Sequence, residues 1–445
     1  MRDVSKSLNS LCWATSIFGA QQMADVLCSA DETRAERSAY VVKKALQQQF
    51  SSNPLYFALD QLGDGVQQQA VDFVWDWLRL KPLDPRWLGR LSGNIFQRSI
   101  GLISALTPGD NLQNTWAILR NTLQVLSFVN DTAAGLDSDS QELNLADEVD
   151  RAYAAGGNYE ALWLIEGLGE EYADRNWVPA APVRGLLSAG SAVQLPAKSM
   201  LMLHAGMGIA FARRTANALT PYSSEAEFTY ALKQFIRLVG DNARQGYEGP
   251  VYESLGLVTR SWYPELLAAI DRALWGIDVN VLEYFWHGVG RAVYFSPQYL
   301  IPGASAFCGI GSEAPHQLAF ENGTAGVAWA FTLVNIRQPE ILLHLVKNLP
   351  ESFTRDGAFT SGVISTCIMA LDTLPDDPNV HRLCCCQPLG TDSGLTAEWE
   401  RLVRGPCNRA VDYYYPLLKS RGQLSEIFRY RDPQALLAGT PGAAQ

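Results

Sequence analysis

Apolar residues recur at intervals of three and four along most of this 445-residue chain. That spacing gathers them on one face of a helix, whereas a half-buried strand needs strict alternation, and convincing alternating runs are absent. The clearest helical segments are ERSAYVVKKALQQQF, DGVQQQAVDFVWDWLRL, NTWAILRNTLQVLSFV, EAEFTYALKQFIRLVG and YPELLAAIDRAL. We therefore predict an all-α fold, built as a repeat-like helical array or a multi-helix bundle.

Low charge distinguishes the chain from an average soluble protein. Charged residues make up only 18% and hydrophobic residues 47% of the sequence, so much of the chain must be buried. The net charge of -11, without a cluster of Lys and Arg, argues against a nucleic-acid partner. No apolar stretch is long enough to span a bilayer, and the N-terminal segment is better read as an amphipathic helix than as a signal peptide. We expect a cytoplasmic protein.

Turn-rich segments divide the chain into regions. The polar, acidic stretch 130–148 separates an N-terminal helical region, 1–129, from a central repeat-like region, 151–336. A C-terminal helical region, 337–435, follows. The Gly- and Ala-rich end, 436–445, is expected to be a disordered tail.

The central region repeats one theme five times. An aromatic or aliphatic residue precedes an acid or a histidine, and a stretch containing glycine then leads into an apolar helix. The polar positions are Glu166, His204, Glu253, His287 and Glu321. Their spacing of 34 to 49 residues is typical of helical-hairpin arrays. If equivalent positions point the same way, these side chains converge on one interior surface.

Glycines in the same segments indicate close helix packing. Gly206 with Ala210, and Gly288 with Ala292, place small residues four apart on one side of a helix. Close approach of two helix backbones can offset the roughly 1 kcal/mol that a helical glycine costs relative to alanine. A nucleotide fingerprint would need a preceding strand and a G-x-G-x-x-G spacing, and both are missing.

A polar stripe crosses the most apolar of these helices. In EYFWHGVGRAVYF, Glu283, His287 and Arg291 lie at i, i+4 and i+8, so they stack along one side. Isolated buried charge is costly, and such groups must pair with one another, bind a metal or line a polar cavity. One interpretation is a structural network in which Glu166 or Glu170 satisfies the stripe.

Two functional interpretations stand beside the structural one. Acids and histidines on facing helices resemble a metal site in a helical bundle, for iron, manganese, copper or zinc. The candidate metal ligands are Glu166, His204, Glu253 and His287. The other interpretation is general acid and base chemistry in a substrate cavity. Its candidate catalytic residues are His204, His287, Glu283 and Arg291.

Eight cysteines include the run Cys384, Cys385 and Cys386. Without a pair of C-x-x-C motifs, they fit neither a zinc ribbon nor a redox dithiol, and we predict reduced, mostly buried thiols. His381 with Cys384 and Cys386 is a further possible metal-ligand set, although its spacing is crowded.

The order of the central motifs carries a resemblance. LHAGMGIAFAR, GYEGPVYES, FWHGVGRAVYF and GTAGVAWAF follow one another between residues 159 and 336. This order resembles the helical domain-of-unknown-function family whose genes accompany enediyne-type polyketide clusters. His287 stands where that family is expected to carry a different polar residue. The resemblance implies a context in bacterial specialised metabolism and no catalytic residues.

These observations predict an enzyme that acts on a hydrophobic polyketide, fatty-acyl or terpenoid substrate, because aromatic residues are dense around the polar stripe. The competing prediction is a non-enzymatic helical scaffold, or a lipid-binding protein, that docks onto biosynthetic partners. Both are compatible with a homo-oligomer.

Overall fold

The computed structural model describes residues 117–118, 121–122, 124–125, 144–155, 158–178, 183–296, 304–388 and 393–432. The chain divides into two compact units. One comprises residues 1–103 and 297–300 and lies outside the described residues, as does nearly all of the predicted N-terminal region and the predicted tail. Every described residue belongs to the other unit, including those on both sides of the predicted border at 336.

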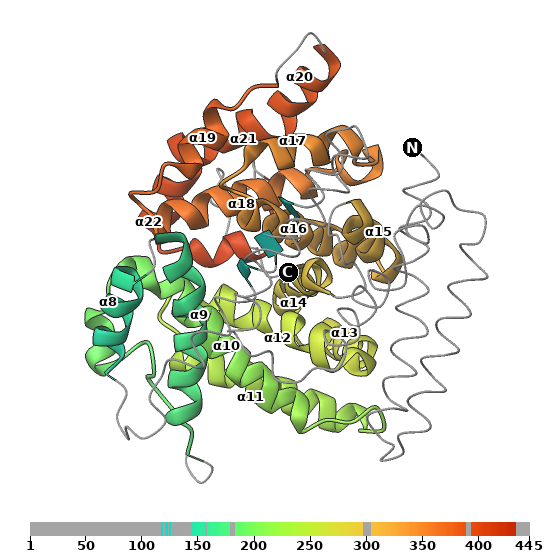
Figure 1. Ribbon diagram of the computed structural model, residues 1–445. Coiled ribbons are helices and arrows are strands. Elements are labelled where there is room, and N and C mark those ends of the chain that lie inside the picture. The colour runs from blue at the N-terminus through green and yellow to red at the C-terminus, as the bar shows by residue number, and fades with distance from the viewer. Residues whose placement is uncertain are drawn as a thin grey trace, which may run out of the picture. The chain divides into compact units, whose positions relative to one another are not determined.

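Every regular element in the described ranges is a helix, which confirms the all-α prediction (Figure 1). The first half contains α8 (Leu145–Ala155), α9 (Asn158–Arg175), η1 (Gly190–Gln194), η2 (Ala197–Ser199), α10 (Met200–Asn217), α11 (Glu225–Asn242), α12 (Glu248–Trp262), η3 (Pro264–Leu266) and α13 (Leu267–Ile277). Next come α14 (Val279–Phe295), α15 (Ala304–Glu313), α16 (Gln317–Val334), α17 (Pro339–Asn348), η5 (Glu351–Phe353) and α18 (Ala358–Thr373). The C-terminal part holds α19 (Asn379–Cys385), α20 (Ser393–Trp399), η6 (Glu400–Arg404), α21 (Gly405–Arg409), η7 (Ala410–Tyr414), α22 (Tyr415–Arg421) and η8 (Leu424–Phe428).

The helices form two sets. The core helices α9, α10, α12, α14, α16 and α18 pack in series, each against the next (Figure 1). The link helices α11, α13, α15 and α17 connect them from α10 onward. In α9 and α10, Glu166 lies against Gly206, and Asp174 accepts a hydrogen bond from Arg214, so these helices run in the same direction. The five predicted repeat positions fall on five successive core helices.

Glycine sets the spacing between core helices. A Cβ on Gly206 would lie 1.8 Å from the carbonyl oxygen of Glu166, and one on Gly326 would lie 2.0 Å from that of His287. Glycine is required at such points because backbone atoms, unlike flexible side chains, cannot move aside. The close packing predicted from the glycine and alanine pattern is therefore observed.

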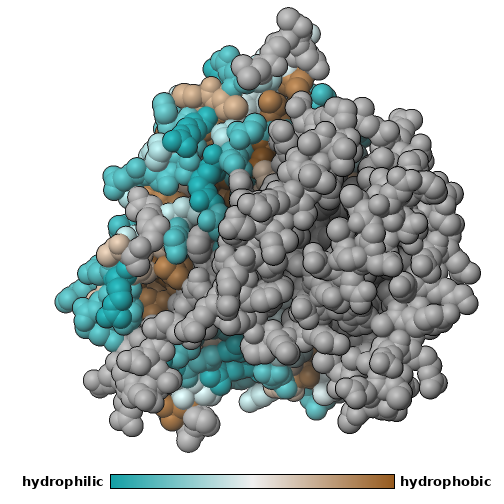
Figure 2. All heavy atoms as spheres, in the orientation of Figure 1, coloured by the Kyte–Doolittle hydropathy of each residue, from teal (hydrophilic) through white to brown (hydrophobic). Residues whose placement is uncertain are grey.

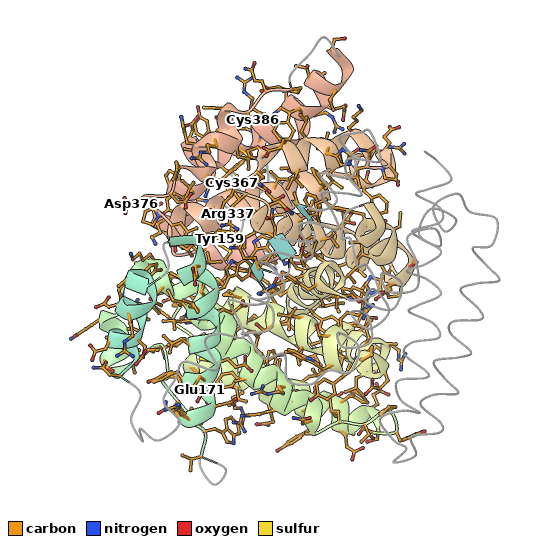
Figure 3. The ribbon with its side chains drawn as sticks, viewed as in Figure 1. Tyr159, Glu171, Arg337, Cys367, Asp376 and Cys386 are labelled. Carbon is orange, nitrogen blue, oxygen red and sulfur yellow. The ribbon has the colours of Figure 1, made fainter. Side chains whose placement is uncertain are left out.

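The series of core helices also makes contacts beyond nearest neighbours. At the start of α9, the Tyr159 hydroxyl donates to the carbonyl oxygens of Leu333 and Val334, with O···O distances of 3.2 Å. The Arg337 guanidinium carbon lies 4.2 Å from the centre of the Tyr159 ring, and Figure 3 shows these two residues together. The first core helix is thus fixed to the end of α16.

Residues 424–432, which include η8, form a C-terminal strap across several core helices. Ser425 Oγ accepts from the backbone N–H of Gly249 at the start of α12, at 2.9 Å. The backbone N–H of Tyr430 donates to Asn322 on α16 at 2.7 Å. The strap therefore joins elements far apart in the sequence. On the face shown in Figure 2, hydrophilic residues predominate among those described.

Candidate functional site

A buried ion network lies where α9, α12 and α14 meet. It consists of Glu166, Glu253, His287 and Arg291, each at most 3% exposed to solvent. His287 and Arg291 are one turn apart on α14 and face the same side, as their spacing predicts. The helices bring these groups together because glycine contacts hold the backbones at short range.

Glu253 accepts hydrogen bonds on both carboxylate oxygens. His287 Nδ1 lies 3.0 Å from Oε1 and must donate, because an ionised carboxylate has only acceptors. Arg291 Nη1 donates to Oε2 at 3.2 Å, and Arg291 Nη2 donates to Glu166 Oε1. The guanidinium therefore bridges carboxylates from α9 and α12, which are not neighbours in the series.

The charges of the network are fixed by their mutual proximity. Burial raises the pKa of Glu253, but Arg291 and the hydrogen bond from His287 outweigh it, and the net shift is downward. Burial lowers the pKa of Arg291, and the two carboxylates outweigh that effect. Glu253 is therefore a carboxylate, and Arg291 a guanidinium, at neutral pH.

Aromatic side chains enclose the imidazole. The ring centre of His287 lies 6.1 Å from that of Trp329 on α16 and 6.4 Å from that of Phe428 on the strap, both edge-on. Trp329 also lies under the Arg291 guanidinium, at 5.1 Å. One wall of the site thus comes from a segment about 140 residues away from His287.

Two polar atoms of the network have no hydrogen-bond partner among the described residues. They are His287 Nε2 and Arg291 Nε, and both are buried. Nε1 of Trp329, whose ring lies 5.1 Å from the Arg291 guanidinium, also has no partner among the described residues. An unsatisfied buried polar group costs about 1 to 3 kcal/mol, so several such atoms on residues of one network call for a physical reason.

His204 does not join the network. Its Nδ1 lies 2.7 Å from the carbonyl oxygen of Met200 and therefore carries the proton, while Nε2 accepts from the backbone N–H of Arg244 at 2.9 Å. Its ring stacks on Tyr247. Burial lowers the pKa of His204 to about 4, although the hydrogen bond to Met200 opposes the shift. His204 is a neutral structural contact between α10 and the segment after α11.

Two other acids from the predicted set lie elsewhere. Glu283 turns to the strap, where its Oε2 lies 2.8 Å from Arg429 Nη1 and 3.0 Å from Arg431 Nη1. Glu321 accepts from Gln317 on its own helix at 2.8 Å. Glu283 thus holds the strap that carries Phe428 and does not contact His287.

Three of the four predicted metal ligands meet around a guanidinium, and the fourth, His204, uses both ring nitrogens for backbone contacts. Among the residues that the structure describes, no group of three or more His, Cys, Asp or Glu side chains is arranged to hold a metal ion. The physical reason is that Arg291 already supplies the positive charge between the two carboxylates.

Comparison with protein-family models, curated proteins and solved structures yields no match. The resemblance to the enediyne-associated family stays a prediction. None of the described helices is both long and apolar enough to cross a bilayer.

Proposed function

We propose that the chain is an enzyme of bacterial specialised metabolism that binds a hydrophobic polyketide, fatty-acyl or terpenoid molecule and transfers a proton at His287 Nε2. The metabolic context rests on the resemblance described above. The site itself rests on one observation, which is that the buried imidazole of His287 has one nitrogen fixed by Glu253 and the other without a partner among the described residues.

Stability alone does not account for this arrangement. Buried ion pairs are often no more stabilising than well-packed apolar side chains, because desolvation offsets the attraction. Unsatisfied atoms at His287 Nε2 and Arg291 Nε add a further cost. Buried polar atoms without partners also occur elsewhere in the described residues, but here two of them belong to one ion network, which favours a ligand that pairs with these atoms.

The geometry suits general base chemistry. With Nδ1–H held by Glu253, neutral His287 carries its lone pair on Nε2, where it can accept a proton from a hydroxyl or from a carbon next to a carbonyl. The Glu253 carboxylate stabilises the imidazolium that forms. The Arg291 Nε–H group is a donor for an oxygen that gains negative charge. Glu253 and Glu166 act as positioning residues.

A ligand reaches His287 only if a wall moves, since the imidazole is fully buried. The strap is the element best suited to move. It supplies Phe428 but belongs to no core helix, and a largely buried set of ion pairs from Arg429 to Glu283 and Glu426 holds it in place. Opening the strap would return these charged side chains to water, and their regained solvation offsets part of the lost attraction.

The test uses ligand-detected and imidazole NMR with decanoate, farnesol and 2-undecanone, which represent fatty-acyl, terpenoid and ketone chemistry. The key variant is His287→Asn, whose amide retains a donor to Glu253 and removes Nε2. His204→Asn is the matched control, because it alters a buried histidine outside the network. We expect His287→Asn, but not His204→Asn, to abolish binding of whichever of the three probes binds the wild type. Circular dichroism checks that both variants fold.

A second candidate function, a non-enzymatic scaffold, is favoured by the filled walls of the site. Trp329 and Phe428 occupy the space around His287, and their ring centres are 6.1 Å apart. Under this alternative the network selects one packing arrangement and binds nothing. It predicts that His287→Asn changes the free energy of unfolding but leaves every probe's response as in the wild type.

A further inference from the structure

Three thiols meet in the C-terminal part of the described chain. Cys367 on α18 donates to Cys407 on α21 with an Sγ···Sγ distance of 3.1 Å. Cys384 on α19 also hydrogen-bonds Cys407. Three helices thus each present one sulfur to a common point, with Cys407 at the centre. Figure 3 shows Cys367 on α18.

The three thiols differ in their contact with solvent. Cys367 and Cys407 are fully buried, whereas Cys384 is 7% exposed and is followed by the exposed Cys385. The hydrogen bond from Cys407 lowers the pKa of Cys384 and outweighs its burial. Burial, followed by the neighbouring sulfurs, raises the pKa of Cys407. Cys384 is therefore the cluster cysteine nearest the surface, and the contact with Cys407 favours its thiolate form.

Metal binding does not explain the cluster. No set of three or more Cys, His, Asp or Glu side chains in the described ranges is arranged to hold a metal ion. His381, which the sequence places near the thiols, instead has its Nε2 3.5 Å from the sulfur of Cys385. What remains distinctive is direct sulfur-to-sulfur contact between elements 40 residues apart.

We propose that Cys367, Cys384 and Cys407 form an oxidation site, at which a hydroperoxide reacts with Cys384 and the final product is a disulfide between Cys367 and Cys407. The inference is independent of the function proposed for His287. It identifies a reversible modification that joins the core helix α18 covalently to α21.

The oxidation proceeds in three steps. The Cys384 thiolate attacks one peroxide oxygen, giving the sulfenic acid and releasing hydroxide, or an alkoxide from an organic peroxide. The Cys407 thiol then displaces the sulfenic oxygen, which leaves as water and creates a disulfide between Cys384 and Cys407. Finally, the Cys367 thiol loses its proton to the hydroxide or alkoxide released in the first step and attacks the Cys407 sulfur, and Cys384 leaves as a thiolate. In total two thiols are oxidised, and the peroxide is reduced to water or to water and an alcohol.

Tryptic mapping of the full chain tests the proposal, because cleavage after arginine separates the thiols. The three cluster cysteines fall on the peptides 356–382, 383–401 and 405–409. The protein is treated with hydrogen peroxide, remaining thiols are alkylated, and the digest is analysed without reduction. We expect peptide 356–382 linked to 405–409, with the link reversed by dithiothreitol. Links confined to other cysteines, or higher oxidation of Cys385 with the cluster unchanged, would overturn the proposal.

Variants assign the roles. Cys384→Ser should slow formation of the link at least about tenfold, because the cluster thiol nearest the surface is lost. Cys308→Ser, which removes an exposed thiol on α15, is the matched control and should leave the rate unchanged. Cys407→Ser should abolish the disulfide between residues 367 and 407. If Cys407→Ser folds poorly, Cys367→Ala provides the same test. An unchanged rate in Cys384→Ser would refute its role as the first thiol oxidised.

Discussion

The carbonyl oxygen of Glu253 lies so close to Gly288 that a Cβ added to this glycine would be only 1.9 Å from it. The same residue presents its carboxylate to His287, the neighbour of Gly288 in the sequence. Helix spacing and the geometry of the buried network are therefore set at one point, and a change in the first must disturb the second.

Gly288→Ala should destabilise the protein by about 3 kcal/mol or more, because the new methyl meets backbone atoms that cannot yield. Gly240→Ala on α11 is the matched control. Its added Cβ would meet nothing within 4 Å, and we expect stabilisation of about 0.5 to 1 kcal/mol. Urea unfolding measures both. Equal effects of the two variants would contradict the packing account.

Arg291→Met should cost about 3 to 5 kcal/mol, since two buried carboxylates lose their counter-charge. The double variant Arg291→Met/Glu166→Gln should recover part of the loss, because one of those charges is removed. The comparison forms a double-mutant cycle followed by urea unfolding. Strictly additive losses would mean that the two side chains are not coupled.

His204 should make stability depend on pH. Its folded pKa of about 4 lies below the ordinary value of 6.5, so the unfolded state binds the extra proton first. The contribution of neutral His204 to the free energy of unfolding is fully present above pH 6.5 and is lost as the pH falls toward 4. It amounts to about 3 kcal/mol, at about 1.4 kcal/mol for each pKa unit. The difference in unfolding free energy between the wild type and His204→Asn should therefore change as the pH falls from 7.5 toward 4, to the disadvantage of the wild type. A difference of constant size would show that protonation of His204 is not involved.

Phe428→Ala should increase the association rate of any probe that binds at His287, because it removes the strap's contact with the imidazole. The variant should also lose about 3 to 5 kcal/mol of stability, the usual cost of truncating a buried phenylalanine. Tyr413→Ala is the matched control, since that aromatic side chain is 63% exposed. Stopped-flow binding gives the rates, and unchanged association would argue against access through the strap.

The sequence predicts the helices and much of the network because both depend on local spacing. The interval of four residues places His287 and Arg291 on one face, and the repeat alignment selects Glu166 and Glu253 as their partners. Glycine next to these positions predicts the close helix contacts. Such features follow from helix geometry alone.

His204 shows where the alignment fails. The carbonyl oxygen of Glu253 faces Gly288, one residue after His287, whereas that of Glu166 faces Gly206, two residues after His204. His204 is therefore one residue out of register with His287, a rotation of about 100° around the helix. Short motifs of an aromatic, an acid or histidine and a glycine do not fix register to a single residue. Only the packed backbones reveal the shift.

The strap could not be predicted from local patterns. Glu283 and Arg429 are 146 residues apart, and their pairing depends on the path of the chain through α15 to α22. Residues 424–431 show no periodicity that would mark a partner. The sequence consequently assigns Glu283 to His287, whereas the structure pairs it with Arg429 and Arg431.

The most direct measurement is a long-range proton–nitrogen NMR spectrum of the imidazoles, with and without decanoate, farnesol and 2-undecanone. The chain has only five histidines, so single variants can assign every signal. We expect His287 to be protonated on Nδ1 in the free protein, and a bound probe to shift Nε2 in the wild type and in His204→Asn. Binding of a probe without any change at His287, or equal binding by His287→Asn, would contradict this expectation.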